Sequence, residues 1–141
     1  MDIKINVTDK QTLLLLDRLE KKVADPEDAL RSICEYQLDS IDLGFRKEID
    51  VDGNPLLPNS PFTIAEKQRL GRINKILQST GAMRNSFNYR VSGATASVGS
   101  SDKKLPKHQF GIGVPERKIL GVRQEDPANW QAILKAYVEE G

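Results

Sequence analysis

Residues 25–49 of the chain read DPEDALRSICEYQLDSIDLGFRKEI. Apolar side chains recur in this stretch at every third or fourth position, namely at Leu30, Ile33, Cys34, Leu38, Ile41, Phe45 and Ile49. Because an α-helix turns once in about 3.6 residues, this spacing places them all on one side of a helix. Asp25-Pro26 marks the start, since Asp is a favoured N-cap and Pro suits the first helical position. The stretch therefore predicts one long amphipathic helix.

The segment before this helix predicts a strand and another helix. Ile3, Ile5 and Val7 alternate with polar residues, which is typical of a short half-buried strand. A helix follows, and its apolar side is made by Leu15, Leu16, Leu19 and Val23. Asp25-Pro26 ends this helix as well as starting the next.

The segment after the long helix predicts a loop and a shorter helix. Residues 50–61, DVDGNPLLPNSP, hold three prolines, a glycine and two asparagines, so we expect an extended loop there. Thr63 and Glu66 match a capping box, in which each side chain bonds to the other residue's exposed amide. We expect the helix that they open to run through Leu70, Ile73 and Leu77 and to end at Thr80-Gly81.

The C-terminal part predicts a hairpin and a last helix. The strand-like runs 87–91 and 94–98 are joined by Ser92-Gly93, which suits a two-residue turn. Residues 99–113 begin with small and basic residues, and we expect a second extended loop. Asp126-Pro127 starts a helix whose apolar stripe is Trp130, Ile133, Leu134 and Tyr137. Together these elements predict a single α+β domain over residues 1–141, with long N-terminal helices packed on a small antiparallel β-sheet and a C-terminal helix.

Length and composition describe an ordinary globular protein. A chain of 141 residues fits one domain and can bury a core without disulfides or metals. The longest apolar run, residues 13–16, is far shorter than the roughly 20 residues of a membrane span. No secretory signal is visible at the N-terminus, and the single cysteine has no internal disulfide partner. We therefore expect the chain to fold in a reducing cytoplasm.

Charge is segregated along the chain although the net charge is only +1. Residues 1–65 carry 8 basic and 13 acidic side chains, a balance of −5. Residues 66–123 carry 12 basic and 3 acidic ones, a balance of +9, and residues 124–141 carry 1 basic and 4 acidic ones, a balance of −3. Folding either mixes these segments into a neutral surface or leaves faces of opposite charge suited to docking against copies or neighbours.

The residues that could carry chemistry are few. His108 is the only histidine, and neither HExxH nor paired CxxC spacing occurs, so we expect no metal site. A Cys34–His108 nucleophile pair is conceivable, but Cys34 lies on the apolar stripe of the long helix, which indicates a buried thiol. Gly111-Ile112-Gly113 lacks the strand–helix setting of a phosphate-binding loop. The sequence therefore predicts no catalytic, cofactor-binding or metal-binding residues.

A basic cluster gives the alternative function. Lys103, Lys104, Lys107 and His108 could contact the phosphates of a nucleic acid, with an affinity that falls with salt. Proteins that bind nucleic acid specifically usually also have a recognition helix or aromatic side chains that stack on bases, and the sequence shows neither beside this cluster. A solvated loop is the competing interpretation.

Short blocks in a fixed order carry a resemblance to a known family. They are Phe45 before Asp52-Gly53-Asn54-Pro55-Leu56 with Pro58, Thr63 through Lys67, Leu77 through Phe87, Val98-Gly99, His108-Gln109-Phe110-Gly111, and Val114-Pro115-Glu116-Arg117 with Leu120-Gly121. In this order the chain resembles the phage virion-morphogenesis or tail-completion proteins of Mu-like and related contractile-tailed phages. It departs from the family's pattern at Leu56, Lys104-Leu105 and Ile119.

The resemblance implies a structural protein that completes or terminates the tail at its head-proximal end and supports head–tail joining. It also implies that the protein acts by forming a ring, with a hexamer as the expected form. The implied partners are further copies of the chain, tail tube or sheath proteins and neck or connector proteins, with DNA only passing through the channel. Location in the virion is implied as well. The candidate assembly contacts are Asp52, Gly53, Asn54, Pro55, Lys103, Lys104, Lys107, His108, Gln109, Phe110 and Arg117.

Overall fold

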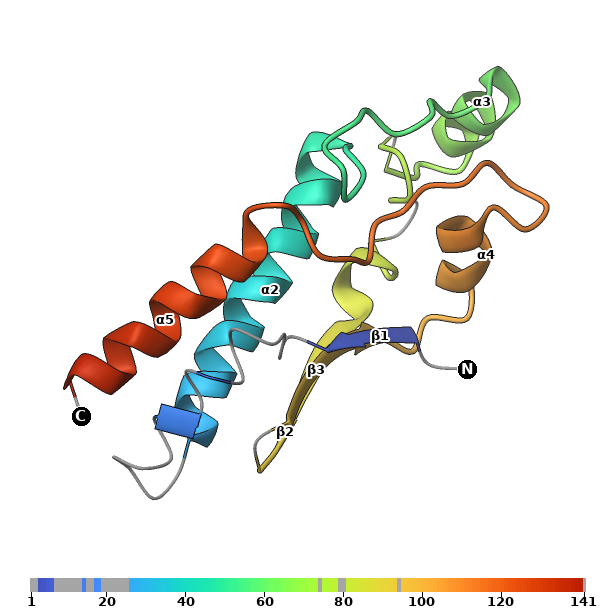
Figure 1. Ribbon diagram of the computed structural model, residues 1–141. Helices are drawn as coiled ribbons and strands as arrows, with labels where there is room; N and C mark the ends of the chain where they lie inside the picture. The colour runs from blue at the N-terminus through green and yellow to red at the C-terminus, as the bar shows by residue number, and fades with distance from the viewer. Residues whose placement is uncertain are drawn as a thin grey trace.

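The computed structural model describes residues 3–6, 14, 17, 18, 26–73, 75–78, 81–93 and 95–140. Its elements are β1 (Ile3–Asn6), α2 (Glu27–Lys47), α3 (Pro61–Arg69), the 3-10 turn η1 (Arg84–Ser86), β2 (Phe87–Ser92), β3 (Thr95–Ser100), α4 (Leu105–Phe110) and α5 (Asp126–Glu140). Helix α2 lies between α5 and the small sheet, while α3 and α4 lie at the other end of the molecule from the C-terminus (Figure 1). The predicted α+β class is confirmed.

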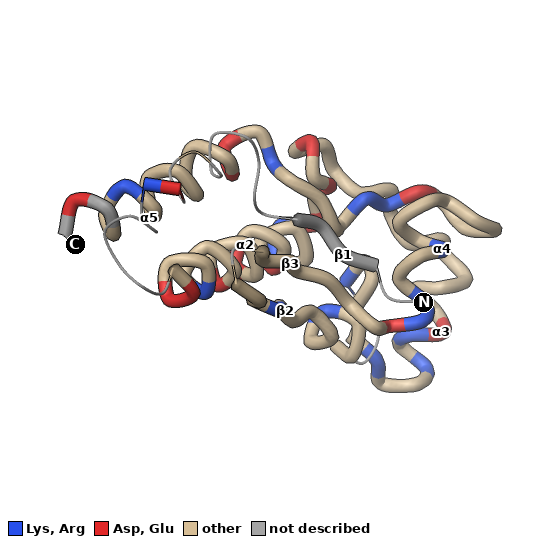
Figure 2. The backbone as a smooth tube through the Cα atoms, turned by 60° about the horizontal axis from the view of Figure 1, so that its bottom comes forward, with Lys and Arg blue, Asp and Glu red and all other residues tan. Residues whose placement is uncertain are grey.

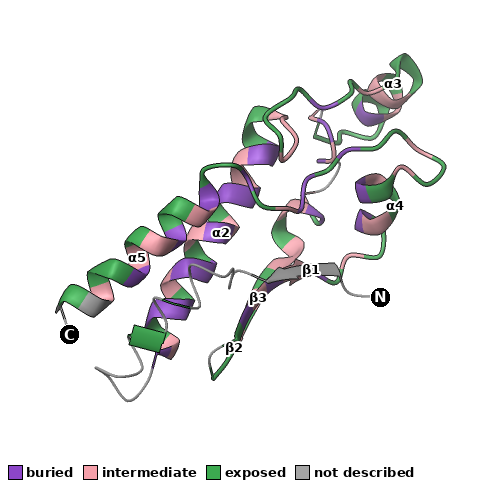
Figure 3. Cartoon of the chain, in the orientation of Figure 1, coloured by how far each residue is buried: buried purple, intermediate pink, exposed green. Residues whose placement is uncertain are grey.

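Helix α2 is the central element, and its apolar stripe forms much of the core. Leu30, Ile33, Cys34, Ile41 and Phe45 are all buried, as the spacing predicted, and Figure 3 shows the buried positions running along the helix. Of the other two predicted positions, Leu38 is half-buried and Ile49 lies beyond the end of the helix. The helix starts at Glu27 with Pro26 as the boundary residue, and it ends at Lys47. Its end is set by Glu48, which adopts a left-handed conformation and donates its N–H to the carbonyl of Gly44.

The preceding helix that we predicted from Leu15, Leu16, Leu19 and Val23 lies on residues outside the described part of the chain, as does the Asp25 cap.

The sheet is antiparallel in the order β1-β3-β2. Its register pairs Ser92 with Thr95, so the hairpin is confirmed, but Ser92, which we predicted in the turn, is the last residue of β2. Gly93 has a φ of 58°, which this kind of tight turn requires.

The predicted capping box and the length of its helix are wrong. Helix α3 is capped by Ser60, whose hydroxyl accepts from the N–H of Thr63, and Pro61 takes the first helical position. Glu66 is paired with Arg69 at 2.9 Å. The helix ends at Arg69, well before Thr80-Gly81, because Gly71 turns the chain with a φ of 65°.

The prediction of an extended loop over residues 99–113 also needs correction. Strand β3 continues to Ser100, and Leu105–Phe110 forms helix α4. Leu105 is fully buried, so burial of one apolar side chain supports a helix in a segment that composition alone marked as a loop. Gly111 ends the helix in a left-handed conformation. Residues 50–60, by contrast, are irregular as predicted.

A buried polar network joins α5 to α2. The Asp126 carboxylate is fully buried and accepts hydrogen bonds from Tyr36 at 2.8 Å, from Gln37 at 3.1 Å, from Ser40 at 3.0 Å and from the N–H of Arg123 at 2.7 Å. The indole N–H of Trp130 in turn donates to Gln37 at 2.9 Å. Helix α5 starts at Asp126 as predicted, but the carboxylate reaches across to α2 instead of capping its own first turn.

Replacing the Asp126 carboxylate should destabilise the fold strongly. In Asp126→Ala, four donors lose their acceptor in a buried site, and we expect the free energy of unfolding to fall by about 3 kcal/mol. Urea denaturation measures this, with Gln124→Ala at an exposed neighbouring position as the matched control. A loss no larger than that of the control would show that the network does not stabilise the α2–α5 contact.

Candidate functional site

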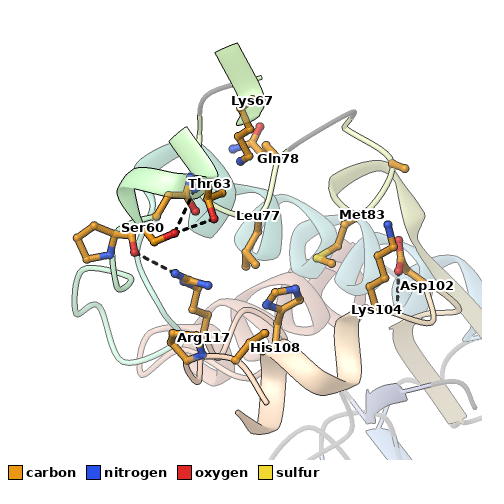
Figure 4. Close-up of a pocket in the computed structure, with 15 residues that line it drawn as sticks. Ser60, Thr63, Lys67, Leu77, Gln78, Met83, Asp102, Lys104, His108 and Arg117 are labelled. Carbon is orange, nitrogen blue, oxygen red and sulfur yellow. Dashed lines mark hydrogen bonds between the residues drawn. The ribbon is translucent and has the colours of Figure 1, made fainter. Parts of the chain in front are cut away.

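A pocket of about 660 Å³ opens where α3 and α4 approach each other (Figure 4). One wall comes from residues 58–60 and from Thr63 and Lys67 of α3. The other walls come from Leu77, Gln78, Ala82 and Met83, from Asp102, Lys104 and His108 around α4, and from Val114, Pro115 and Arg117. The lining is mixed, since apolar side chains such as Leu77 and Met83 lie beside the charged ones.

The pocket is rich in positive charge. Lys67, Lys104, His108 and Arg117 line it, against the single carboxylate of Asp102. Two of the cations are buried, since Lys67 is 8% exposed and Arg117 is 7% exposed. Lys67 donates to the carbonyl of Lys75 at 2.7 Å, and Arg117 donates to the carbonyls of Leu57 at 2.9 Å and Pro58 at 3.1 Å. Their hydrogen bonds thus go to neutral carbonyls.

The pKa values of these groups follow from burial and mutual repulsion. Burial lowers the pKa of the Lys67 ammonium, and the positive charge of Arg117 lowers it further, while Glu48 raises it. Burial also lowers the pKa of Arg117. The pKa of His108 is lowered by burial first and then by Lys107, Arg117 and Lys104, with Asp102 acting in the opposite direction. Burial is the largest cause of each shift, and repulsion from neighbouring cations adds to it at Lys67 and His108.

The structure brings three of the predicted assembly contacts together in this pocket, namely Lys104, His108 and Arg117. Lys103, Lys107 and Phe110 are exposed around α4 but are not among its lining residues. Gln109 serves the fold instead: it is buried, donates to the carbonyl of Leu120 at 2.6 Å, and accepts from the N–H groups of Ile119 at 3.1 Å and Leu120 at 3.0 Å.

The other predicted contacts, Asp52 through Pro55, form an exposed turn away from the pocket lining. The Asp50 carboxylate accepts from the N–H groups of Asp52 and Asn54, each at 2.9 Å, and so fixes the turn. Gly53 has a φ of 85°, which favours glycine at that position. The turn is therefore an ordered projection of the surface.

A model of the phage virion morphogenesis family matches residues 7–139, nearly the whole chain. The chain belongs to the phage virion morphogenesis family. Searches of curated proteins and of solved structures found no significant match. Membership in this family points to a structural component of the phage particle with a role in its assembly, and to a structural protein rather than an enzyme.

The single cysteine of the chain lies in the core of the fold. Cys34 is fully buried in the core, and burial raises the pKa of its thiol to about 11, with the charge of Glu35 adding to the effect. Among the described residues no group of three or more metal-ligating side chains gathers. None of the described helices is long and apolar enough to cross a membrane.

Among the pocket residues that the sequence did not single out as contacts, Lys67 and Gln78 are polar and buried. Lys67 lies on a short helix with no strong apolar stripe, so nothing in its spacing indicated a buried ammonium. Gln78 is buried and donates to the carbonyl of Phe45 at 2.9 Å, and its own carbonyl accepts from Arg84 at 3.1 Å. No local pattern in the sequence indicated that Gln78 would be buried.

Gln109 should behave as a structural residue. In Gln109→Met the side-chain volume is kept but three buried backbone groups lose their partners, so we expect the free energy of unfolding to fall by about 3 kcal/mol. Lys107→Met, on the exposed face of the same helix, is the matched control and should change stability little. Equal denaturation midpoints for the two variants would contradict the role of Gln109 in the fold.

The Cys34 thiol should be inert in the folded protein. Burial shields the sulfur and keeps it protonated at neutral pH, so a thiol-specific chromogenic reagent should label the native chain at least ~100-fold more slowly than the urea-unfolded chain. Cys34→Ser should leave assembly unchanged apart from a modest loss of stability. Rapid labelling of the native protein would revive a nucleophilic role for this cysteine.

Proposed function

We propose that the chain completes the phage tail at its head-proximal end and supports head–tail joining as the subunit of a ring. The family match over residues 7–139 is the observation that carries this proposal. The sequence resemblance to tail-completion proteins gives its finer part, since the matched blocks include most residues of the pocket, the end of α4 from His108 and the turn at 52–55. The ring is proposed as hexameric on the same ground.

The distribution of exposed apolar side chains supports a protein-binding role for the end of the molecule that carries α3 and α4. We call this the α3/α4 end and define it by Leu57, Phe62, Leu70, Ile73, Phe110 and Ile112, which are all exposed. Phe62 is 75% exposed and Ile112 is 65% exposed. Large exposed apolar side chains gathered on neighbouring elements commonly mark an interaction site. Figure 1 shows α3 and α4 together at this end.

This surface fits an assembly partner better than a substrate. Side chains such as Phe62 and Phe110 project from helices on the outside of the molecule, where they gain contact area only when another surface covers them. Covering a fully exposed aromatic side chain contributes about 1.5–3 kcal/mol. Several such contacts around the α3/α4 end would suffice for a specific interface in a ring or against a neck protein.

Substitutions at the α3/α4 end should block assembly without unfolding the chain. In Phe62→Ser with Phe110→Ser, we expect the denaturation midpoint to stay unchanged, because both side chains are exposed. We expect a phage that depends on this variant to lose infectious particles by at least ~10-fold, with free heads and free tails accumulating, because two anchors of about 1.4 kcal/mol or more each are lost. Val122→Ser removes an exposed apolar side chain outside α3 and α4 and is the control.

Two outcomes would contradict the proposal. Finished, infectious tails in the complete absence of the chain would show that it has no role in tail completion. A purified chain that stays monomeric and captures no tail-tube, sheath or neck protein would exclude ring assembly.

The competing function is a basic accessory protein that binds nucleic acid around α4. Lys103, Lys104 and Lys107 are exposed there, which this function requires. It predicts an affinity for DNA or RNA that falls steeply with salt and disappears when the three lysines are replaced by alanine. Binding with these properties, together with normal tails in the triple variant, would favour it over tail completion.

A further inference from the structure

The buried cations of the pocket have no carboxylate partner. In the part of the chain that the structure describes, neither Lys67 nor Arg117 forms an ion pair. The Lys67 side chain forms one hydrogen bond and the Arg117 side chain two, all to backbone carbonyls. Because an ammonium has three N–H donors and a guanidinium five, both groups keep donors for a ligand. A buried charge without a counter-charge is costly, so an anion that reached these groups would be stabilised.

The positive groups lie close enough to act on one another. After burial, the charge of Arg117 is a cause of the lowered pKa of both Lys67 and His108, and Lys104 lowers the pKa of His108 as well. Such repulsion falls with distance, so these groups gather around one space. Figure 2 shows Lys and Arg along α3 and beside α4. A single carboxylate in the pocket would therefore interact with several of them at once.

The carboxylates that already act on these groups do not neutralise the pocket. Glu48, which raises the pKa of Lys67, lies 3.9 Å from the ammonium of Lys75. Asp102 lines the pocket and accepts from the N–H of Lys104 at 2.8 Å. Even with Asp102 counted, the lining side chains carry a positive net charge.

His108 provides a second, independent indication of a ligand. Its Nδ1 atom is buried and has no hydrogen-bond partner. A buried nitrogen left unpaired costs free energy that a hydrogen-bonding ligand would recover. Figure 4 shows the imidazole among the side chains that line the pocket. A carboxylate held there would favour the protonated imidazole and accept a hydrogen bond from it.

The size and walls of the pocket indicate an occupant larger than an inorganic ion. About 660 Å³ falls within the range of sites that bind whole organic ligands. Leu77, Met83, Val114 and Pro115 give the pocket an apolar wall. The occupant should therefore combine a carboxylate with apolar groups.

The surroundings of the pocket favour a protein as the source of that carboxylate. Leu57, Phe62, Phe110 and Ile112 are exposed, and each lies within two residues of a residue that lines the pocket. Only a macromolecule covers the pocket and these side chains together. A nucleic acid would present phosphates and sugars, which leave large apolar side chains unmatched. A protein segment with acidic and apolar side chains matches both.

We propose that the pocket binds an acidic side chain, aspartate or glutamate, from a segment of another virion protein in which apolar residues flank the acid. The inference deepens the proposed assembly role of the α3/α4 end and rests on it. The carboxylate lies against Lys67, Arg117 and His108, with the exposed Lys104 at the edge. An internal side chain fits better than a chain end, because exposed apolar residues flank the pocket on both the α3 and the α4 side, at Phe62 and at Phe110–Ile112.

Binding of short peptides to the purified full chain tests this. In an array of acetylated and amidated peptides, each has one central glutamate among apolar residues that vary over the array. Beside it stand a twin with glutamine in place of glutamate and a twin whose sole carboxylate is a free C-terminus. We expect a group of glutamate peptides to bind at least ~10-fold more tightly than either twin, because the charge-assisted hydrogen bonds need a carboxylate and the flanking contacts need chain on both sides.

Two neighbouring lysines give a matched pair of variants. Lys103 and Lys104 are both exposed, but only Lys104 lines the pocket. Lys104→Glu and Lys103→Glu change the net charge equally, and both should leave the denaturation midpoint unchanged. We expect Lys104→Glu to bind the glutamate peptides about tenfold more weakly and Lys103→Glu to bind them like the wild type. Lys67→Met, which removes the buried charge and keeps the aliphatic stem, should abolish the preference for glutamate over glutamine.

His108 reports directly on the pocket, because it is the only histidine of the chain. Its ring signals can be followed by NMR over a pH series with and without peptide. A glutamate beside the imidazole favours the protonated form, so the pKa of His108 should rise with a glutamate peptide and stay unchanged with its glutamine twin. A purely structural role of the pocket cations would produce no such difference. Peptide binding without this rise would place the carboxylate elsewhere and overturn the proposal.

The remaining outcomes separate this contact from the function on which it rests. Tighter binding of the free C-terminus, of inorganic phosphate alone or of duplex DNA, lost in Lys67→Met, would identify a chain-end, small-anion or nucleic-acid site and overturn the proposal. If no glutamate peptide binds while phages lacking the chain still fail to finish their tails, the contact is wrong and tail completion stands. Finished, infectious tails without the chain would overturn the proposed function, and with it a virion protein as the occupant.

Discussion

The carboxylate of Asp126 lies where α2, α5 and residues 121–123 meet, and the positions of the more distant segments depend on it. A fully buried negative charge must be satisfied by hydrogen bonds, which fixes the donors around it. One of these is the N–H of Arg123, whose side chain reaches on to the carbonyls of Ser40 at 3.2 Å and Asp50 at 2.7 Å. Gly44 allows Ile119 to pack closely against α2, since a Cβ at Gly44 would lie 2.7 Å from Ile119 Cδ1. The end of α2 and residues 119–123 are thereby held in register.

Hydrogen bonds of the backbone and of side chains connect this junction to the pocket. The N–H of Val51 donates to the carbonyl of Lys118 at 3.0 Å, and the N–H of Arg117 donates to the carbonyl of His108 at 2.7 Å. The guanidinium of Arg117 then holds residues 57 and 58 by their carbonyls. Gln109 ties α4 to residues 119 and 120. Elements far apart in the sequence are thus joined by polar groups, while apolar packing is concentrated on α2.

Sequence reasoning succeeded where one strong local signal governs an element. The stripe of α2 from Leu30 to Phe45, the existence of the hairpin and the Asp126-Pro127 start of α5 were predicted correctly, because periodicity and turn chemistry act within a few residues. It failed where tertiary burial outweighs composition. Helix α4 forms because Leu105 enters the core, and α3 stops early at Gly71 in spite of the apolar residues beyond it. In the site, the predicted Lys104, His108 and Arg117 converge, whereas the burial of Lys67 depends on distant segments that no local pattern reveals.

The pocket also bears on why an assembly subunit would keep unfavourable charges. Lys67 and Arg117 would stabilise the free chain better as apolar side chains of similar volume, since their burial is matched only by carbonyl contacts. A buried charge that only carbonyls match gains free energy when an anion reaches it. Such a charge therefore favours a partner that brings a carboxylate and disfavours one that brings another cation.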